Sequence, residues 1–210
     1  MFVGDSLTVG YTSYPEVNGV KVPEISWYRS LGSKMGGKSI GWMNDHFDEA
    51  TNAIPKPKSI IVLGWVNDLC NYALTNITPG AKVRDAQTMA DDIFKNFKSM
   101  ADKATAAWIK FIIGTQLPFD SFLEKQTYAS QEPILHDAMK LINDKIKSTR
   151  PDTYIDFATT FTDPTNPWHL PKIYDSGDGV HLNISGYKKM QQLIFSTWKT
   201  SATVPQQSIV

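Results

Sequence analysis

Short apolar runs alternate along the chain with longer segments whose apolar residues recur every three or four positions. The short runs are typical of buried strands and lie at residues 1–3, 59–63, 108–114 and 153–157, with a weaker one near 38–40. The helical spacing predicts helices over residues 23–35, 44–53, 83–104, 131–149 and 185–198. Strands that alternate with helices favour a parallel sheet that is covered on both faces.

Five such strands predict an α/β fold, a flavodoxin-like three-layer α/β/α sandwich around a five-stranded parallel sheet. In folds of this kind, the loops at the carboxyl ends of the strands build the functional site. The 210 residues contain no internal repeat and no internal linker. We therefore expect one domain over residues 1–200 and a short tail over residues 201–210.

Composition excludes several classes of protein. Lysine plus arginine and aspartate plus glutamate each number 21, and this balance argues against a nucleic-acid binder that relies on a basic field. The single cysteine, Cys70, excludes an internal disulfide framework. No run of 18 apolar residues predicts a membrane span, and the first residues do not have the pattern of a signal peptide. Only three residues precede the first motif, which is short for a strand, so we expect a domain cut from a longer protein.

Three distant stretches contain the residue types that acyl transfer needs. They are Gly4–Leu7, Asn67–Asp68 and Asp178–His181. Acyl transfer requires a nucleophile, a base, a group that orients the base and hydrogen-bond donors for the oxyanion. The stretches supply a candidate for each role. Their order, with the serine first and the Asp and His three residues apart at the far end, differs from other serine-hydrolase orders.

This combination resembles the GDSL, or SGNH, family of hydrolases over residues 2–198. The resemblance implies that Ser6 is the nucleophile, that His181 is the base and that Asp178 orients His181. It further implies an oxyanion hole made of the Ser6 N–H, the Gly41 N–H and the Asn67 side-chain amide. It implies no cofactor. The spacing of His46, His136 and His169 also predicts no metal site.

The sequence departs from the family pattern in its third block. The family usually has Gly-x-Asn-Asp, whereas here Trp65 stands in the glycine position and Gly64 lies one residue too early. We expect a reshaped loop that keeps the role of Asn67. We expect Asp5 to be structural, as an acceptor for nearby backbone amides.

Two other motifs compete with this interpretation. Residues 32–39 match the phosphate-binding pattern G-x-x-x-x-G-K-[ST], and residues 37–41 match the nucleophile elbow G-x-S-x-G around Ser39. The first should follow a strand, but residues 24–31 have a helical pattern. The second should follow several strands, but only 36 residues precede it. We therefore favour Ser6 over Ser39 as the nucleophile.

Three tryptophans lie near the candidate site residues in sequence, and their rings would suit a sugar or an acyl chain. They are Trp42, Trp65 and Trp168. No long apolar segment predicts a lipase lid.

The sequence favours an esterase that removes short acyl groups, acetyl above all, from a carbohydrate or cell-envelope glycan. The alternatives are a short-chain lipid esterase or thioesterase and, in other classes, a P-loop nucleotide-binding protein or a non-catalytic binding module. The resemblance also fits an extracellular, cell-envelope or virion-associated location, within a larger multidomain or phage-tail protein.

Overall fold

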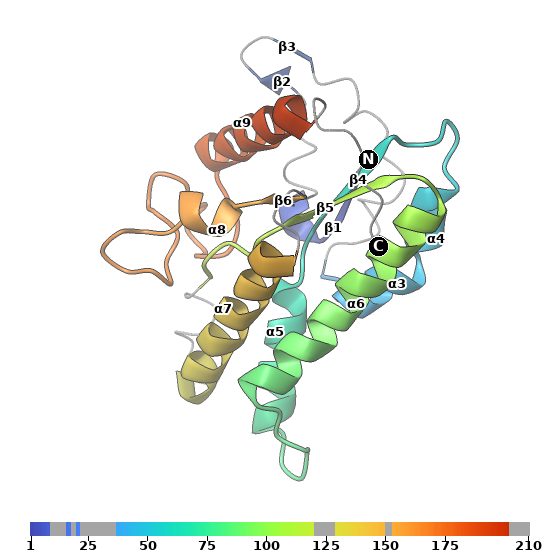
Figure 1. The fold of residues 1–210 in the computed structure, drawn as a ribbon. Coiled ribbons are helices and arrows are strands. Elements are labelled where there is room, and N and C mark those ends of the chain that lie inside the picture. Colours follow the sequence, from blue (N-terminus) through green and yellow to red (C-terminus); the bar gives the residue numbers. More distant parts are fainter. Residues whose placement is uncertain (9–15, 18–19, 22–36, 120–128, 150–152, 202–210) are drawn as a thin grey trace.

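A parallel sheet forms the centre of the computed structural model, which describes residues 1–8, 16–17, 20–21, 37–119, 129–149 and 153–201 (Figure 1). Its four strands in the described part have the spatial order β1 (Phe2–Gly4), β4 (Ser59–Leu63), β5 (Lys110–Gly114) and β6 (Tyr154–Ile155). All neighbouring strands are parallel, with Val3 opposite Val62 and Gly4 opposite Leu63. A separate antiparallel pair joins β2 (Glu16–Val17) to β3 (Val20–Lys21).

Helices cover both faces of this sheet. Alternate strand residues point to opposite faces, so Val3 and Val62 join one buried cluster while Phe2 and Ile61 join the other. The first cluster packs against α3 (Ile40–Asp45), α4 (Phe47–Thr51), α5 (Val66–Ile77), α6 (Ala86–Ala106) and α7 (Glu132–Thr149). The second packs against α8 (Phe157–Thr160) and α9 (Ile184–Ser201), which lies across the sheet from α6 and α7 in Figure 1. The predicted three-layer α/β fold is confirmed, but the described sheet has four parallel strands where five were predicted.

The long helices form where the apolar spacing predicts them. Asp85 begins α6 because its carboxylate accepts a hydrogen bond from the Thr88 N–H at 2.7 Å. The buried side chains of α6 then recur at helical spacing, among them Met89, Ile93 and Phe97. No helix in the described part of the chain has the length and apolar character needed to cross a membrane.

The structure corrects two local predictions. The weak strand expected near residues 38–40 is wrong, because the Ser39 hydroxyl accepts a hydrogen bond from the Trp42 N–H and begins α3 there. The helix α5 was not predicted at all. The helix expected over residues 23–35 lies outside the described residues, as does the predicted tail beyond Ser201, where α9 ends.

Candidate active site

Ser6, His181 and Asp178 form a continuous hydrogen-bonded chain. Ser6 lies directly beyond the carboxyl end of β1, and its Oγ is 2.8 Å from Nε2 of His181. On the other side of the ring, Nδ1 of His181 is 2.6 Å from Oδ2 of Asp178. The structure therefore brings together three residues that are up to 175 positions apart in sequence.

A tight turn before α9 orients the His181 ring. Oδ1 of Asp178 accepts hydrogen bonds from the backbone N–H groups of Val180 and His181, at 3.0 and 2.8 Å. Oδ1 of Asp175 accepts from the N–H of Gly179 at 2.9 Å. These bonds fix the backbone between Asp178 and His181, so the carboxylate and the imidazole face each other.

The Asp178 carboxyl is held in its ionised form although its side chain is about half exposed, at 52%. Partial burial would raise its pKa. The hydrogen bonds from His181 and Val180 outweigh this effect and lower the pKa to about 2. A carboxylate that remains charged at neutral pH can stabilise positive charge on the neighbouring imidazole.

Asp5 is completely buried beside the nucleophile. Its Oδ1 accepts a hydrogen bond from the Leu7 N–H at 3.0 Å, which confirms the expectation that it binds a nearby amide. Its Oδ2 also accepts from the side-chain amide of Asn67 at 3.2 Å. Burial raises the pKa of Asp5 to about 7, against the lowering effects of the Leu7 N–H and of His181.

The pair Asn67–Asp68 lies in the first turn of α5 and joins two other segments. Besides Asp5, the Asn67 amide donates to the carbonyl oxygen of Lys38 at 3.2 Å. Oδ2 of Asp68 accepts from the Ile40 N–H at 2.8 Å, at the beginning of α3. Burial, reinforced by the charge of Asp5, raises the pKa of Asp68 to about 7. A role for Asp68 was not predicted, although its place beside Asn67 could have indicated one.

Two glycines allow the ends of β1 and β4 to approach each other. A Cβ on Gly4 would lie 1.8 Å from the Leu63 carbonyl oxygen, and a Cβ on Gly64 would lie 2.6 Å from the Asp5 nitrogen. Gly64 also has a φ of +140°, which favours glycine. The close approach of Gly64 to Asp5 and its positive φ therefore both require a glycine at position 64.

The backbone N–H groups of Ser6 and Gly41 have no hydrogen-bond partner within the described part of the chain. Gly41 lies in the first turn of α3, where Asp68 accepts from the preceding N–H and Ser39 accepts from the following one. The first N–H groups of a helix lack intrahelical acceptors, so the Gly41 N–H is available to a ligand.

The family assignment follows from the match of residues 1–194 to the model of the GDSL-like lipase/acylhydrolase family. The chain belongs to this family. As a GDSL-like acylhydrolase, it is a serine ester hydrolase by family membership. No curated protein matches the sequence.

Solved structures share the fold of this GDSL-like protein at low sequence identity. A GDSL-like lipase from Bacteroides thetaiotaomicron is 20% identical with a TM-score of 0.66, over 95% of this chain and 87% of that one. A putative acylhydrolase from Bacteroides fragilis is 22% identical with a TM-score of 0.64, over 95% and 86%. An acetyl xylan esterase is 17% identical with a TM-score of 0.56, over 97% and 98%.

The competing serine, Ser39, has different surroundings. Its hydroxyl caps α3, and no histidine hydrogen bonds to it among the residues that the structure describes. The glycine-rich segment that precedes it lies mostly outside those residues. In the described part of this GDSL-like protein, no group of three or more His, Cys, Asp or Glu side chains is arranged to hold a metal ion.

The three tryptophans have different environments. Trp65 is 0% exposed and packs edge-on against Phe97, so the prediction that it contacts substrate is wrong. Trp42 and Trp168 are half-buried and stack on histidine rings, with centroid distances of 3.8 Å to His46 and 4.0 Å to His136. Their role in substrate binding stays a prediction.

Proposed function

We propose that the protein is a serine esterase with the triad Ser6, His181 and Asp178. The observation that carries this proposal is the unbroken hydrogen-bonded chain from Ser6 Oγ through both ring nitrogens of His181 to Asp178 Oδ2, at 2.8 and 2.6 Å. A nucleophile, a base and an orienting carboxylate in this order are what acyl transfer requires.

In this mechanism, His181 Nε2 takes the proton of Ser6 as Oγ attacks the ester carbonyl. Asp178, ionised because its pKa is about 2, accepts from Nδ1–H and stabilises the imidazolium. Collapse of the tetrahedral intermediate expels the alcohol, which receives the proton from His181, and leaves an acyl group on Ser6. Water then attacks this acyl-enzyme with His181 again as the base, which releases the acid and restores Ser6.

The proposed oxyanion donors are the N–H groups of Ser6 and Gly41 and the amide of Asn67. The two backbone groups have no competing acceptor in the described part of the chain. Asn67 now donates to Asp5 and to Lys38, and the bond to Lys38 is the solvent-exposed one. We infer that this N–H turns from Lys38 to the oxyanion when substrate binds. Each such donor lowers the barrier by about 3 kcal/mol.

Replacement of either candidate serine tests the site. Ser6→Ala should lower the hydrolysis of p-nitrophenyl acetate by several powers of ten, whereas Ser39→Ala, the matched serine control, should retain most of it. Circular dichroism of both variants checks that they are folded. If Ser39→Ala were inactive and Ser6→Ala were normal, Ser39 in the elbow motif would be the nucleophile and the assignment of Ser6 would be wrong.

For the substrate, we propose short acyl esters, acetyl above all, on a carbohydrate. The similarity in fold to an acetyl xylan esterase supports this class. The half-buried faces of Trp42 and Trp168 suit a sugar ring.

A series of p-nitrophenyl esters distinguishes acetyl from long-chain substrates. Each methylene buried in an acyl tunnel contributes about 0.8 kcal/mol, so a tunnel would make kcat/KM rise steeply with chain length. We expect the highest kcat/KM at two to four carbons, a fall by eight carbons, and release of acetate from acetylated polysaccharide. Activity that rises from four to twelve carbons, with no acetate released from any glycan, would replace the carbohydrate proposal with a lipid esterase.

A further inference from the structure

A groove lies beyond the carboxyl ends of β5 and β6, between α7 and the chain that leads from α8 towards Asp178. Its volume is about 170 Å³. Its described walls include Gln116, Asn143, Lys147, Thr162 and Trp168. The proposed mechanism uses none of these side chains.

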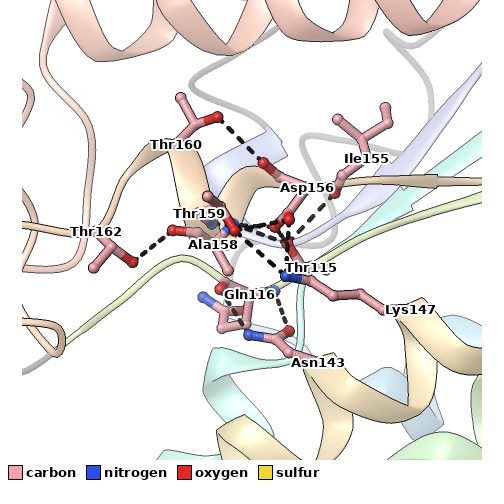
Figure 2. Close-up of polar contacts among 10 residues, drawn as sticks. All are labelled: Thr115, Gln116, Asn143, Lys147, Ile155, Asp156, Ala158, Thr159, Thr160 and Thr162. Carbon is pink, nitrogen blue, oxygen red and sulfur yellow. Dashed lines mark hydrogen bonds and ion pairs between the residues drawn. The ribbon is translucent and has the colours of Figure 1, made fainter.

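Gln116 is the unusual residue of this groove. It is 1% exposed, and neither its side-chain oxygen nor its side-chain nitrogen has a hydrogen-bond partner among the residues that the structure describes. Its backbone, in contrast, is fixed by Asn143, which accepts from the Gln116 N–H at 2.9 Å and donates to the Gln116 carbonyl oxygen at 3.2 Å (Figure 2). An unsatisfied buried polar group costs about 1–3 kcal/mol. A ligand that both donates and accepts would satisfy the amide, and a hydroxyl group does both.

The charges around the groove are already paired within the protein. Lys140 contacts Asp144 at 2.6 Å, and Lys147 contacts Asp156 at 2.8 Å, the latter drawn in Figure 2. The groove therefore offers a ligand no unpaired cation among these residues. This favours a neutral, hydroxyl-rich ligand over a phosphate or a carboxylate.

One wall of the groove is an aromatic ring held in a fixed plane. Trp168 stacks on His136 with a centroid distance of 4.0 Å and an interplanar angle of 4°. Trp168 is only half-buried, so part of its ring faces the groove. An apolar ring face beside an amide is the combination that binds the two kinds of surface on a sugar, its C–H face and its hydroxyl groups.

The sheet order fixes the separation of the groove from the nucleophile. Ser6 follows β1, whereas Gln116 follows β5, two strands away. At about 4.8 Å between neighbouring strands, the two positions are about 10 Å apart along the sheet edge. The neighbouring units of a glycan chain whose acylated unit lies at Ser6 can span this separation.

We propose that the groove is a subsite for an unacylated sugar unit of a glycan whose acylated unit lies at Ser6. The inference rests on the proposed carbohydrate-esterase function and deepens it. Gln116 supplies the donor and acceptor for sugar hydroxyl groups, and Trp168 supplies the stacking face. The subsite selects oligosaccharide esters over small esters, because only a chain occupies both positions.

Gln116→Leu, which keeps the size of the side chain and removes its amide, tests the subsite. The ratio of kcat/KM on acetylated xylo-oligosaccharides to that on p-nitrophenyl acetate should fall about tenfold, mainly through KM. Calorimetry with xylotetraose and with N-acetylated chitotetraose, which are neutral and carry no ester, should show binding to the wild type that Gln116→Leu weakens about tenfold. Gln87→Leu, on the exposed face of α6, is the matched control and should change neither measurement. Trp168→Ala repeats the test at a half-buried position if Gln116→Leu does not fold.

The outcomes separate the subsite from the enzyme function. Glycan deacetylation by the wild type with an unchanged ratio in Gln116→Leu and Trp168→Ala overturns the subsite and leaves the esterase proposal standing. Binding of an oligosaccharide that depends on Gln116, without acetate release from any glycan, supports the subsite and overturns the carbohydrate-esterase function. Failure of both oligosaccharides to bind the wild type overturns the subsite.

Discussion

Gly64→Ala is expected to damage the site from a position outside it. A Cβ on Gly64 would lie 2.6 Å from the Asp5 nitrogen, about 0.8 Å short of ordinary contact. The obstructing atom is backbone, so the chain beside the nucleophile must move. Misplacement of a catalytic group by about 1 Å costs about 100-fold in rate. The φ of +140° adds strain of about 1–3 kcal/mol for a residue with a side chain.

Gly80→Ala is the control that separates the effect of backbone strain from the effect of displacing the chain beside Ser6. Gly80 also has a positive φ, +79°, but a Cβ there meets no atom within 4 Å. For a chain of this size, about 1 kcal/mol lowers Tm by about 2–4 °C. We expect that loss in Gly80→Ala with normal hydrolysis of p-nitrophenyl acetate. Gly64→Ala should show a larger loss of Tm and about 100-fold lower kcat/KM. Equal Tm and equal activity in the two variants would refute the argument that the Gly64–Asp5 contact positions Ser6.

Three further predictions concern charge and ligands. Asp178→Asn should lower kcat on p-nitrophenyl acetate by about 10³–10⁴, since the imidazole loses its orienting carboxylate; a loss below tenfold would contradict this role. Burial raises the pKa of Asp68 from 3.8 to about 7, so the stability that its protonated form contributes is full below pH 3.8 and is lost as pH rises through 7. The Tm of the wild type should therefore fall between pH 4 and pH 8 by more than that of Asp68→Asn, and parallel curves would exclude the effect. Millimolar MgATP should leave Tm unchanged, whereas a rise in Tm that Lys38→Ala abolishes would favour a P-loop.

The sequence predicts the framework because the signals of its strands and long helices are strong. The run at residues 60–63 is apolar throughout, as is typical of a strand that is buried on both faces, and β4 forms at Ser59–Leu63. Residues 83–104 predict a helix from their spacing, and α6 spans Ala86–Ala106. The predicted carboxyl ends of β1 and β4 lie within one residue of the observed ends. Ser6 and Asn67 therefore both lie just beyond the carboxyl edge of the sheet, as predicted.

The missed elements have weak local signals. The segment of α5 contains three asparagines, which favour caps and turns over helix interiors. Its helix is instead stabilised by the burial of Val66, Leu69 and Ala73, which is a tertiary effect. The direction in which the Trp65 side chain points is likewise determined by tertiary packing and not by the local sequence. Its place beside Asn67 in sequence could not reveal that its ring lies in the core against Phe97.

The contacts of Asn67 show why the family motifs alone do not establish catalysis. Its amide joins Asp5, 62 residues away, and Lys38, 29 residues away, while the adjacent Asp68 joins Ile40. These bonds hold together the end of β1, the beginning of α3 and the first turn of α5. A binding protein on this fold would need the same bonds to assemble, so an intact Asp5, Asn67 and Asp68 do not distinguish it from an enzyme. The contact between Ser6 and His181 does distinguish them, because the described contacts give it no structural task. Ser6→Ala should therefore remove activity while it leaves Tm within about 2 °C of the wild type, and a large loss of Tm would show that this contact is structural after all.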